Sequence, residues 1–179
     1  PGLGQGEWGK HALERVIRCD KPALWDADAL NLLAIAPDTR HNRVITPHPG
    51  EAARLLNCSI QEIESDRLLS ASRLVARYGG CVVLKGAGTL VATQRHMAIV
   101  DVGNPGMASG GMGDVLSGII GALLAQGLTI YDAASAGCVA HGAAADSLAS
   151  RYGTRGMLAM DLLPALYPFV NPEMNNFLS

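Results

Sequence analysis

Long apolar runs are missing from this 179-residue chain. The most apolar stretch, from Val115 to Ala125, is much shorter than the roughly 20 residues that a membrane-spanning helix needs. No stretch has the charged, apolar and small-residue order of a secretory signal peptide either. We therefore expect a cytoplasmic protein without a membrane partner.

The sequence also lacks an excess of positive charge and the spacings of common metal sites. Its formal net charge is −2, which argues against nucleic acid as a partner. The cysteines form no C-x-x-C pair, and no His/Cys cluster with ligand spacing occurs. We expect reduced, mostly buried cysteines: Cys19, Cys58, Cys81 and Cys138.

Linkers, repeats and low-complexity tracts are absent, so residues 1–179 are predicted to form a single domain. Apolar patterns of helical and strand period alternate along the chain. This alternation is typical of an α/β protein with a mostly parallel sheet covered by helices on both faces. Helices are expected at residues 6–18, 28–34, 50–57, 60–78, 111–126, 131–150 and 157–170. Strands are expected at residues 22–27, 43–49, 81–85, 89–93 and 97–102.

A glycine-rich segment, "GNPGMASGGMGD" at residues 103–114, follows a predicted strand and opens a predicted helix. The first turn of a helix has unpaired N–H groups and partial positive charge, and glycines let a ligand approach them closely. Such a segment is suited to binding phosphate. It is not a Walker A loop, and Leu116 stands where a dinucleotide-binding fingerprint needs its third glycine.

Asp114 lies where this loop meets the helix. One interpretation is an ordinary first-turn acid, which the helix dipole favours. The other is a general base that takes a proton from a hydroxyl while the loop holds a phosphoryl group. We favour the base. A phosphate site normally avoids an anion, so an acid at this position indicates that it takes part in the chemistry. The following helix is apolar on nearly every side, and we expect it to be buried, with close contacts at Gly118, Gly121, Ala122 and Ala125.

At these residues the chain resembles the ribokinase-like superfamily, whose signature is G-x-G-D at a helix start. Within that superfamily it is similar to the ADP- or ATP-dependent NAD(P)H-hydrate dehydratases, repair enzymes that are often fused behind an epimerase domain. The resemblance covers most of the chain to about residue 150. It rests on "PGLG" (1–4), "WDADAL" (25–30), "TPHPGEAARLL" (46–56), "VVLKGAGTLVA" (82–92) and "SGGMGDVLSGIIGALLAQG" (109–127).

The resemblance implies a reaction in which ADP or ATP, with Mg²⁺, phosphorylates the ring hydroxyl of hydrated NADH or NADPH. Phosphate then leaves and restores NAD(P)H. Asp114 matches the family's catalytic base. The family's nucleotide-binding segments match Lys85, Gly86, Ala87, Gly88, Thr89, Asn104, Gly106, Met107, Ala108, Ser109, Gly110, Gly111, Met112 and Gly113. The family's hydrate-binding residues match Gly4, His48, Pro49, Gly50, Glu51 and Asp114.

Several of these side chains have a structural alternative. In related sugar kinases an N-x-x-E motif organises magnesium and phosphate, and here His48 stands at the Asn position. Glu51 could therefore act through magnesium, or be a first-turn helix acid. Lys85 also has two interpretations: it contacts the nucleotide, or it is a solvated lysine at the end of a strand.

Two further acids follow a predicted strand. For Asp26 two interpretations stay open, a ligand-binding role and a structural role. Asp28 is expected to be a helix N-cap. His141 is expected to be a packed core or interface histidine.

The chain departs from the family in one respect: the family's first βα units precede "GPGLG" and have no counterpart here. We expect the chain to match the C-terminal two-thirds of that domain, with residues or an epimerase domain before Pro1 in the natural protein. We also expect a homo-oligomer. Two rival functions stay open, a kinase acting on a small molecule such as a vitamin-precursor alcohol and a non-catalytic nucleotide-binding fragment.

Overall fold

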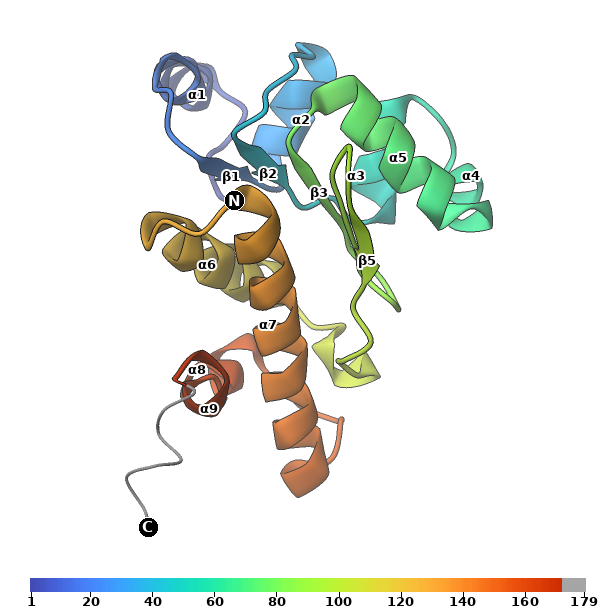
Figure 1. Ribbon diagram of the computed structural model, residues 1–179, viewed down its shortest axis with the longest axis vertical. Helices are drawn as coiled ribbons and strands as arrows, with labels where there is room; N and C mark the ends of the chain where they lie inside the picture. The colour runs from blue at the N-terminus through green and yellow to red at the C-terminus, as the bar shows by residue number, and fades with distance from the viewer. Residues whose placement is uncertain (172–179) are drawn as a thin grey trace.

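A computed structural model describes residues 1–171 of the chain (Figure 1). The helices are α1 (Glu7–Arg18), α2 (Asp28–Ile35), α3 (Pro49–Leu56), α4 (Ile60–Ser65), α5 (Arg67–Tyr78), α6 (Met112–Ala125), α7 (Ile130–Tyr152), α8 (Leu162–Ala165) and α9 (Tyr167–Val170), with the 3₁₀ turns η1 (Pro105–Met107) and η2 (Ala159–Asp161). The strands are β1 (Ala23–Trp25), β2 (Arg43–Ile45), β3 (Cys81–Leu84), β4 (Leu90–Ala92) and β5 (Met97–Ile99).

The five strands form one sheet in the order β1-β2-β3-β4-β5. The strands β1, β2 and β3 are parallel, whereas β3, β4 and β5 pair in antiparallel fashion. The α/β class is confirmed, but the sheet is mixed and not mostly parallel. The reason is the short connections at residues 85–89 and 93–96, because only a long crossover can return a strand to a parallel position.

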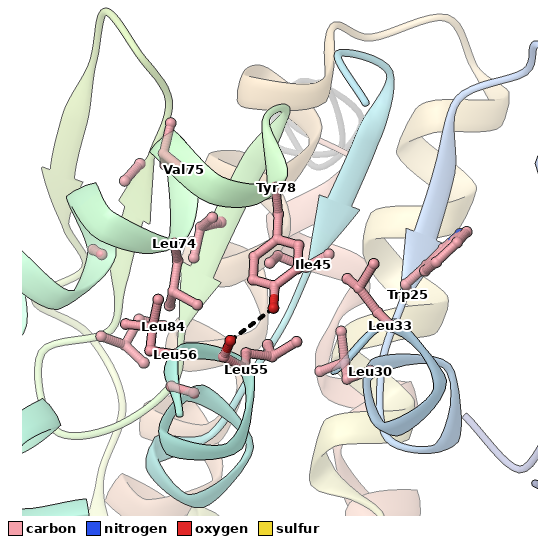
Figure 2. Packing of buried hydrophobic residues seen from close by; sticks show 14 of the residues in the cluster. Trp25, Leu30, Leu33, Ile45, Leu55, Leu56, Leu74, Val75, Tyr78 and Leu84 are labelled. Carbon is pink, nitrogen blue, oxygen red and sulfur yellow. Dashed lines mark hydrogen bonds between the residues drawn. The ribbon is translucent and has the colours of Figure 1, made fainter. Parts of the chain in front are cut away.

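Helices cover both faces of this sheet, and each face has its own core. The helices α2, α3 and α5 pack on one face, and α6 and α7 pack on the other (Figure 1). Successive residues of a strand point to opposite faces, so Val82 faces the first core and Val83 the second. In the first core, the Tyr78 hydroxyl donates a 2.7 Å hydrogen bond to the Leu55 carbonyl (Figure 2).

Two predicted helices are interrupted. The helix predicted at 60–78 is divided at Asp66, which leaves the helical region (φ −148°, ψ 87°) while its carboxylate caps the start of α5 by accepting from Leu69 N. The helix predicted at 157–170 is divided into η2, α8 and α9. Pro164 and Pro168 lie there, and neither can donate the N–H that a continuous helix requires.

The prediction that α6 is buried on all sides is wrong for the part of the chain described. Leu116, Ile120 and Leu124 form its buried stripe. The face with Gly118 and Ala122 is exposed, and a Cβ at Gly118 would meet no atom within 4 Å. The close helix approach occurs instead at Gly137 of α7, whose Cβ would lie 2.6 Å from Ile120 Cγ1.

The cysteines are free, as expected. Cys81 and Cys138 are buried, Cys58 is half-buried and Cys19 is exposed. Burial raises the pKa of both Cys81 and Cys138 to about 12, so they behave as apolar core residues. Within residues 1–171, no helix combines the length and the hydropathy that crossing a membrane requires.

Candidate active site

The candidate site lies at the carboxyl ends of the three parallel strands. Asp26 follows β1, the segment Thr46–His48 follows β2, and Lys85 follows β3. Parallel strands end at the same edge of a sheet, so these three segments meet there. The first turn of α6 reaches the same edge from the opposite face, because a Cβ on Gly113 would lie 3.5 Å from both Asp26 Oδ2 and Lys85 Nζ.

Lys85 lies between two buried carboxylates. Its Nζ is 3.0 Å from Asp26 Oδ1 and 3.8 Å from Glu51 Oε2. Asp26 is 3% exposed and Glu51 7%, and the hydroxyl of Ser117 in α6 donates to Asp26 Oδ2 at 3.3 Å. Lys85 is therefore not a solvated lysine at a strand end, since it neutralises buried charge at the centre of the site.

His48 and Glu51 form the start of α3. Nδ1 of His48 accepts from Gly50 N at 3.0 Å and from Glu51 N at 3.4 Å, while Glu51 Oε2 accepts from His48 N at 2.8 Å. This reciprocal capping box makes Glu51 a first-turn acid that also faces Lys85. Because Nδ1 accepts, the neutral ring has its proton on Nε2, and the ring is half-exposed.

Asp28 has a different role from the N-cap that we predicted. The N-cap of α2 is Ala27, and the Asp28 carboxylate accepts instead from Gly4 N at 2.9 Å and from Gln5 Nε2 at 3.2 Å. Ala27 has φ 48°, a conformation unfavourable for a residue with a Cβ. It turns the chain so that Asp26 points at Lys85 while Asp28 holds the N-terminal glycine loop.

The start of α6 offers free backbone donors. Gly111 precedes the helix with φ 86°, a conformation suited to glycine, and no side chain caps the helix. The first N–H groups of α6 are therefore open to an anion. Asp114 is an exposed acid in this first turn. The structure thus places Gly113 beside the Asp26–Lys85 pair, and Asp114 is the next residue of the same turn.

The loop at 103–110 is held by a residue that sequence reasoning missed. Asp146 of α7 accepts from Gly103 N and from Asn104 Nδ2, both at 2.8 Å. The Asn104 Oδ1 accepts from Gly106 N at 3.0 Å, and the Ser109 hydroxyl donates to Met157 O at 3.1 Å. The side chains of Asn104 and Ser109 therefore shape the loop.

The loop at 85–89 is held in a similar way by Arg67 of α5. Its Nη2 donates to Leu84 O at 3.2 Å and to Lys85 O at 3.3 Å. A Cβ at Gly86, where φ is 150°, would lie 2.7 Å from Arg67 Nη1. Thr89 Oγ1 donates to Gly86 O at 3.1 Å and closes the turn.

His141 lies in α7 beneath the start of α6, and its prediction as a buried histidine is confirmed at 6% exposure. Burial lowers its pKa to about 4, against the opposing effect of a hydrogen bond to the backbone of Met112. The ring is therefore neutral at physiological pH. Among residues 1–171, no three His, Cys, Asp or Glu side chains gather as a metal site.

One protein family matches almost the whole chain. The family model described as NAD(P)H-hydrate dehydratase matches residues 1–167. The chain is 72% identical to the bifunctional NAD(P)H-hydrate repair enzyme Nnr of Escherichia coli K12, over 98% of this chain and 34% of that enzyme. The chain thus spans about a third of the length of this curated relative.

Solved structures agree with this match. The ADP/ATP-dependent NAD(P)H-hydrate dehydratase of Bacillus subtilis, crystallised with ATP/Mg²⁺, superposes with a TM-score of 0.86 at 29% identity, over 96% of this chain and 64% of that one. A ribokinase-like superfamily protein of Enterococcus faecalis gives a TM-score of 0.76 at 28% identity, over 94% and 61%. The expected ribokinase-like fold is confirmed.

Proposed function

The chain belongs to the NAD(P)H-hydrate dehydratase family, and from that premise we propose that it restores NADH and NADPH from their hydrates at the expense of ADP or ATP. The observation that carries the proposal is the first turn of α6. It has open N–H donors and an exposed carboxylate, Asp114, and Gly113 lies against the ammonium of Lys85.

Asp114 is proposed as the general base. It takes the proton of the ring hydroxyl as the hydroxyl oxygen attacks the terminal phosphorus of the nucleotide. The new oxygen–phosphorus bond forms while the bond to the leaving nucleotide phosphate breaks. The carbon–oxygen bond of the ring then breaks, and phosphate departs with the bonding electrons. The neighbouring ring carbon gives up a proton to water, and the ring recovers its double bond.

The charge on the transferring phosphoryl group is met by the first-turn N–H groups of α6, at Met112 to Asp114. These donors are fixed by the fold before the nucleotide arrives, which is the condition for effective electrostatic stabilisation. Lys85, beside Gly113, offsets the negative charge that Asp26 and Glu51 bring to this part of the site. The loops that hold the nucleotide are proposed to be residues 85–89 and residues 104–113.

The hydrate is proposed to lie on the α3 side of the site, against Gly4, His48, Pro49, Gly50 and Glu51. Gly4 is fixed there through Asp28, and the Nε2–H of His48 is available as a donor because Nδ1 is occupied by the capping interactions. These residues position the ring hydroxyl, and Asp114 completes the contact from the α6 side.

Magnesium fits this site only with the help of the nucleotide. The carboxylates of Asp26 and Glu51 are both near Lys85, and no cluster of three ligand side chains occurs within residues 1–171. Mg²⁺ commonly binds through one or two carboxylates plus substrate phosphates. Glu51 or Asp26 would supply the protein ligand, and the ion would neutralise phosphate charge.

We also propose that residues 1–179 belong to a single ribokinase-like domain, as its C-terminal two-thirds, and that the protein is a cytoplasmic homo-oligomer. Support for assembly comes from large apolar side chains that are mostly exposed, including Tyr152 (79%), Met160 (69%) and Tyr167 (61%). Light scattering of the purified protein measures the subunit number directly.

The function is tested by incubating the protein with hydrated NADH and ADP. The absorbance band of NADH should return only when ADP or ATP is present. A kinase of the same superfamily would instead accumulate a phosphorylated product without that band. Return of the band at equal rates with and without nucleotide would contradict the proposal.

A further inference from the structure

A cavity of about 420 Å³ opens beside the candidate site, between the N-terminal loop, α2 and α3. Its lining consists of Gln5, Asn31, Ala34, Ile35 and Arg54. None of these residues takes part in the Asp26–Lys85–Glu51 cluster.

The polar groups of this cavity are mostly donors. The Arg54 guanidinium donates through Nη1 to Asn31 Oδ1, and Gln5 donates its amide to Asp28. Arg54 is exposed and forms no ion pair within residues 1–171. Its remaining N–H groups can therefore bind an anion, and the planar guanidinium matches two phosphate oxygens at once.

The cavity is continuous with the segments proposed to bind the hydrate. Gln5 adjoins Gly4, and both donate to the same carboxylate of Asp28. Arg54 follows Gly50 by one helical turn of α3, about 6 Å along the helix axis. The cavity therefore lies on the α3 side of Lys85, whereas the glycine loop before α6 lies on the other face of the sheet.

We propose that this cavity binds a phosphate group of the dinucleotide substrate, and that Arg54 is the residue that holds it. The proposal rests on the proposed function, since a hydrated dinucleotide carries a pyrophosphate, and that of NADPH carries a further ribose phosphate. Asn31 orients the guanidinium, and the Gln5 amide lies beside it. Arg54 is thus assigned a substrate-binding role beyond its bridge between α2 and α3.

The test is a calorimetric titration of the protein with NADH, NADPH and ADP. Arg54→Gln should weaken binding of the dinucleotides about 10- to 100-fold, because a charge-assisted hydrogen bond is lost. Arg54→Lys keeps the charge without the planar fork. Its affinity for the dinucleotides should lie between those of the wild type and of Arg54→Gln. Arg73→Gln removes another exposed arginine, on α5, and should bind every ligand as the wild type does. ADP affinity should be unchanged in all three variants.

The pattern of weakening identifies the phosphate. Equal weakening for NADH and NADPH assigns the pyrophosphate, and weakening for NADPH alone assigns its extra ribose phosphate. The proposal is overturned if Arg54→Gln binds both dinucleotides like the wild type, if the wild type binds neither, or if ADP binding falls as much. Dinucleotide binding that depends on Arg54 but leads to no dehydration would contradict the proposed function and leave this inference standing.

Discussion

Asp114 is the residue on which the proposed chemistry depends most. Asp114→Asn keeps the size of the side chain and removes the proton acceptor. Loss of a general base costs about 10²- to 10⁴-fold in rate, while ADP affinity should stay within a few-fold of wild type. Steady-state hydrate turnover and ADP titration measure the two effects. Glu14→Gln, at an exposed acid of α1, is the matched control and should leave both unchanged.

The Lys85 ammonium stabilises the fold as well as the site. Removing it in Lys85→Met leaves the buried carboxylates of Asp26 and Glu51 without their cation. Breaking a buried pair in this way lowers the free energy of unfolding by about 3–5 kcal/mol. Urea unfolding should show that loss, and adding Asp26→Asn to the same chain should recover part of it. An unchanged midpoint in Lys85→Met would mean that the pair contributes nothing to stability.

His141 makes stability depend on pH. Its pKa is lowered to about 4 in the folded chain, so the unfolded chain binds a proton on this ring in a pH range where the folded chain does not. The contribution is fully present above about pH 6.5 and is lost as pH falls toward about 4, up to about 3 kcal/mol. His141→Asn cannot titrate. Its free energy of unfolding should therefore fall less than that of the wild type between about pH 7 and about pH 4. Parallel curves for the two proteins would show that His141 is not the responsible group.

At the scale of elements, the start of α6 depends on glycine conformation. Gly111 has φ 86°, and a Cβ there would lie 3.1 Å from Ala159 Cβ. Gly111→Ala therefore costs about 1–2 kcal/mol of conformational energy and should displace the first-turn donors. We expect weaker ADP binding in the titration.

Gly118→Ala, seven residues after Gly111 and on the exposed face of α6, is the matched control. It has open space and ordinary helical backbone, so it should be neutral or stabilising by up to about 1 kcal/mol. ADP binding that is equally strong in Gly111→Ala and the wild type would argue against an anion site at this helix start.

The sequence predicts best those elements that are determined by neighbouring residues. The positions of α1, α2, α6 and α7 are encoded by nearby apolar spacing and were predicted within a few residues. The break at Asp66 depends on one capping side chain, and the burial of α6 on only one face depends on which partners the sheet supplies. Neither cause is visible in a window of neighbouring residues.

At the scale of the whole molecule, the site is built by topology. Three parallel strands bring Asp26, His48 and Lys85 to one edge, and α6 adds Gly113 from the opposite face. The glycine loop and the segments at 48–51 and 85–89 could be predicted, because each is a short continuous motif. The pairing of Asp26 with Lys85 across 59 residues, and of Asp146 with Asn104 across 42, arises only when the chain is folded.

The most direct test of the central claim follows the oxygen of the ring hydroxyl. Hydrated NADH is prepared with a heavy oxygen isotope in that hydroxyl and incubated with the protein and ADP, and the released phosphate is analysed by mass spectrometry. If Asp114 activates the hydroxyl to attack phosphorus, each phosphate released with a restored NADH carries one heavy oxygen. Unlabelled phosphate, with the heavy oxygen recovered in water, would contradict phosphoryl transfer to the substrate.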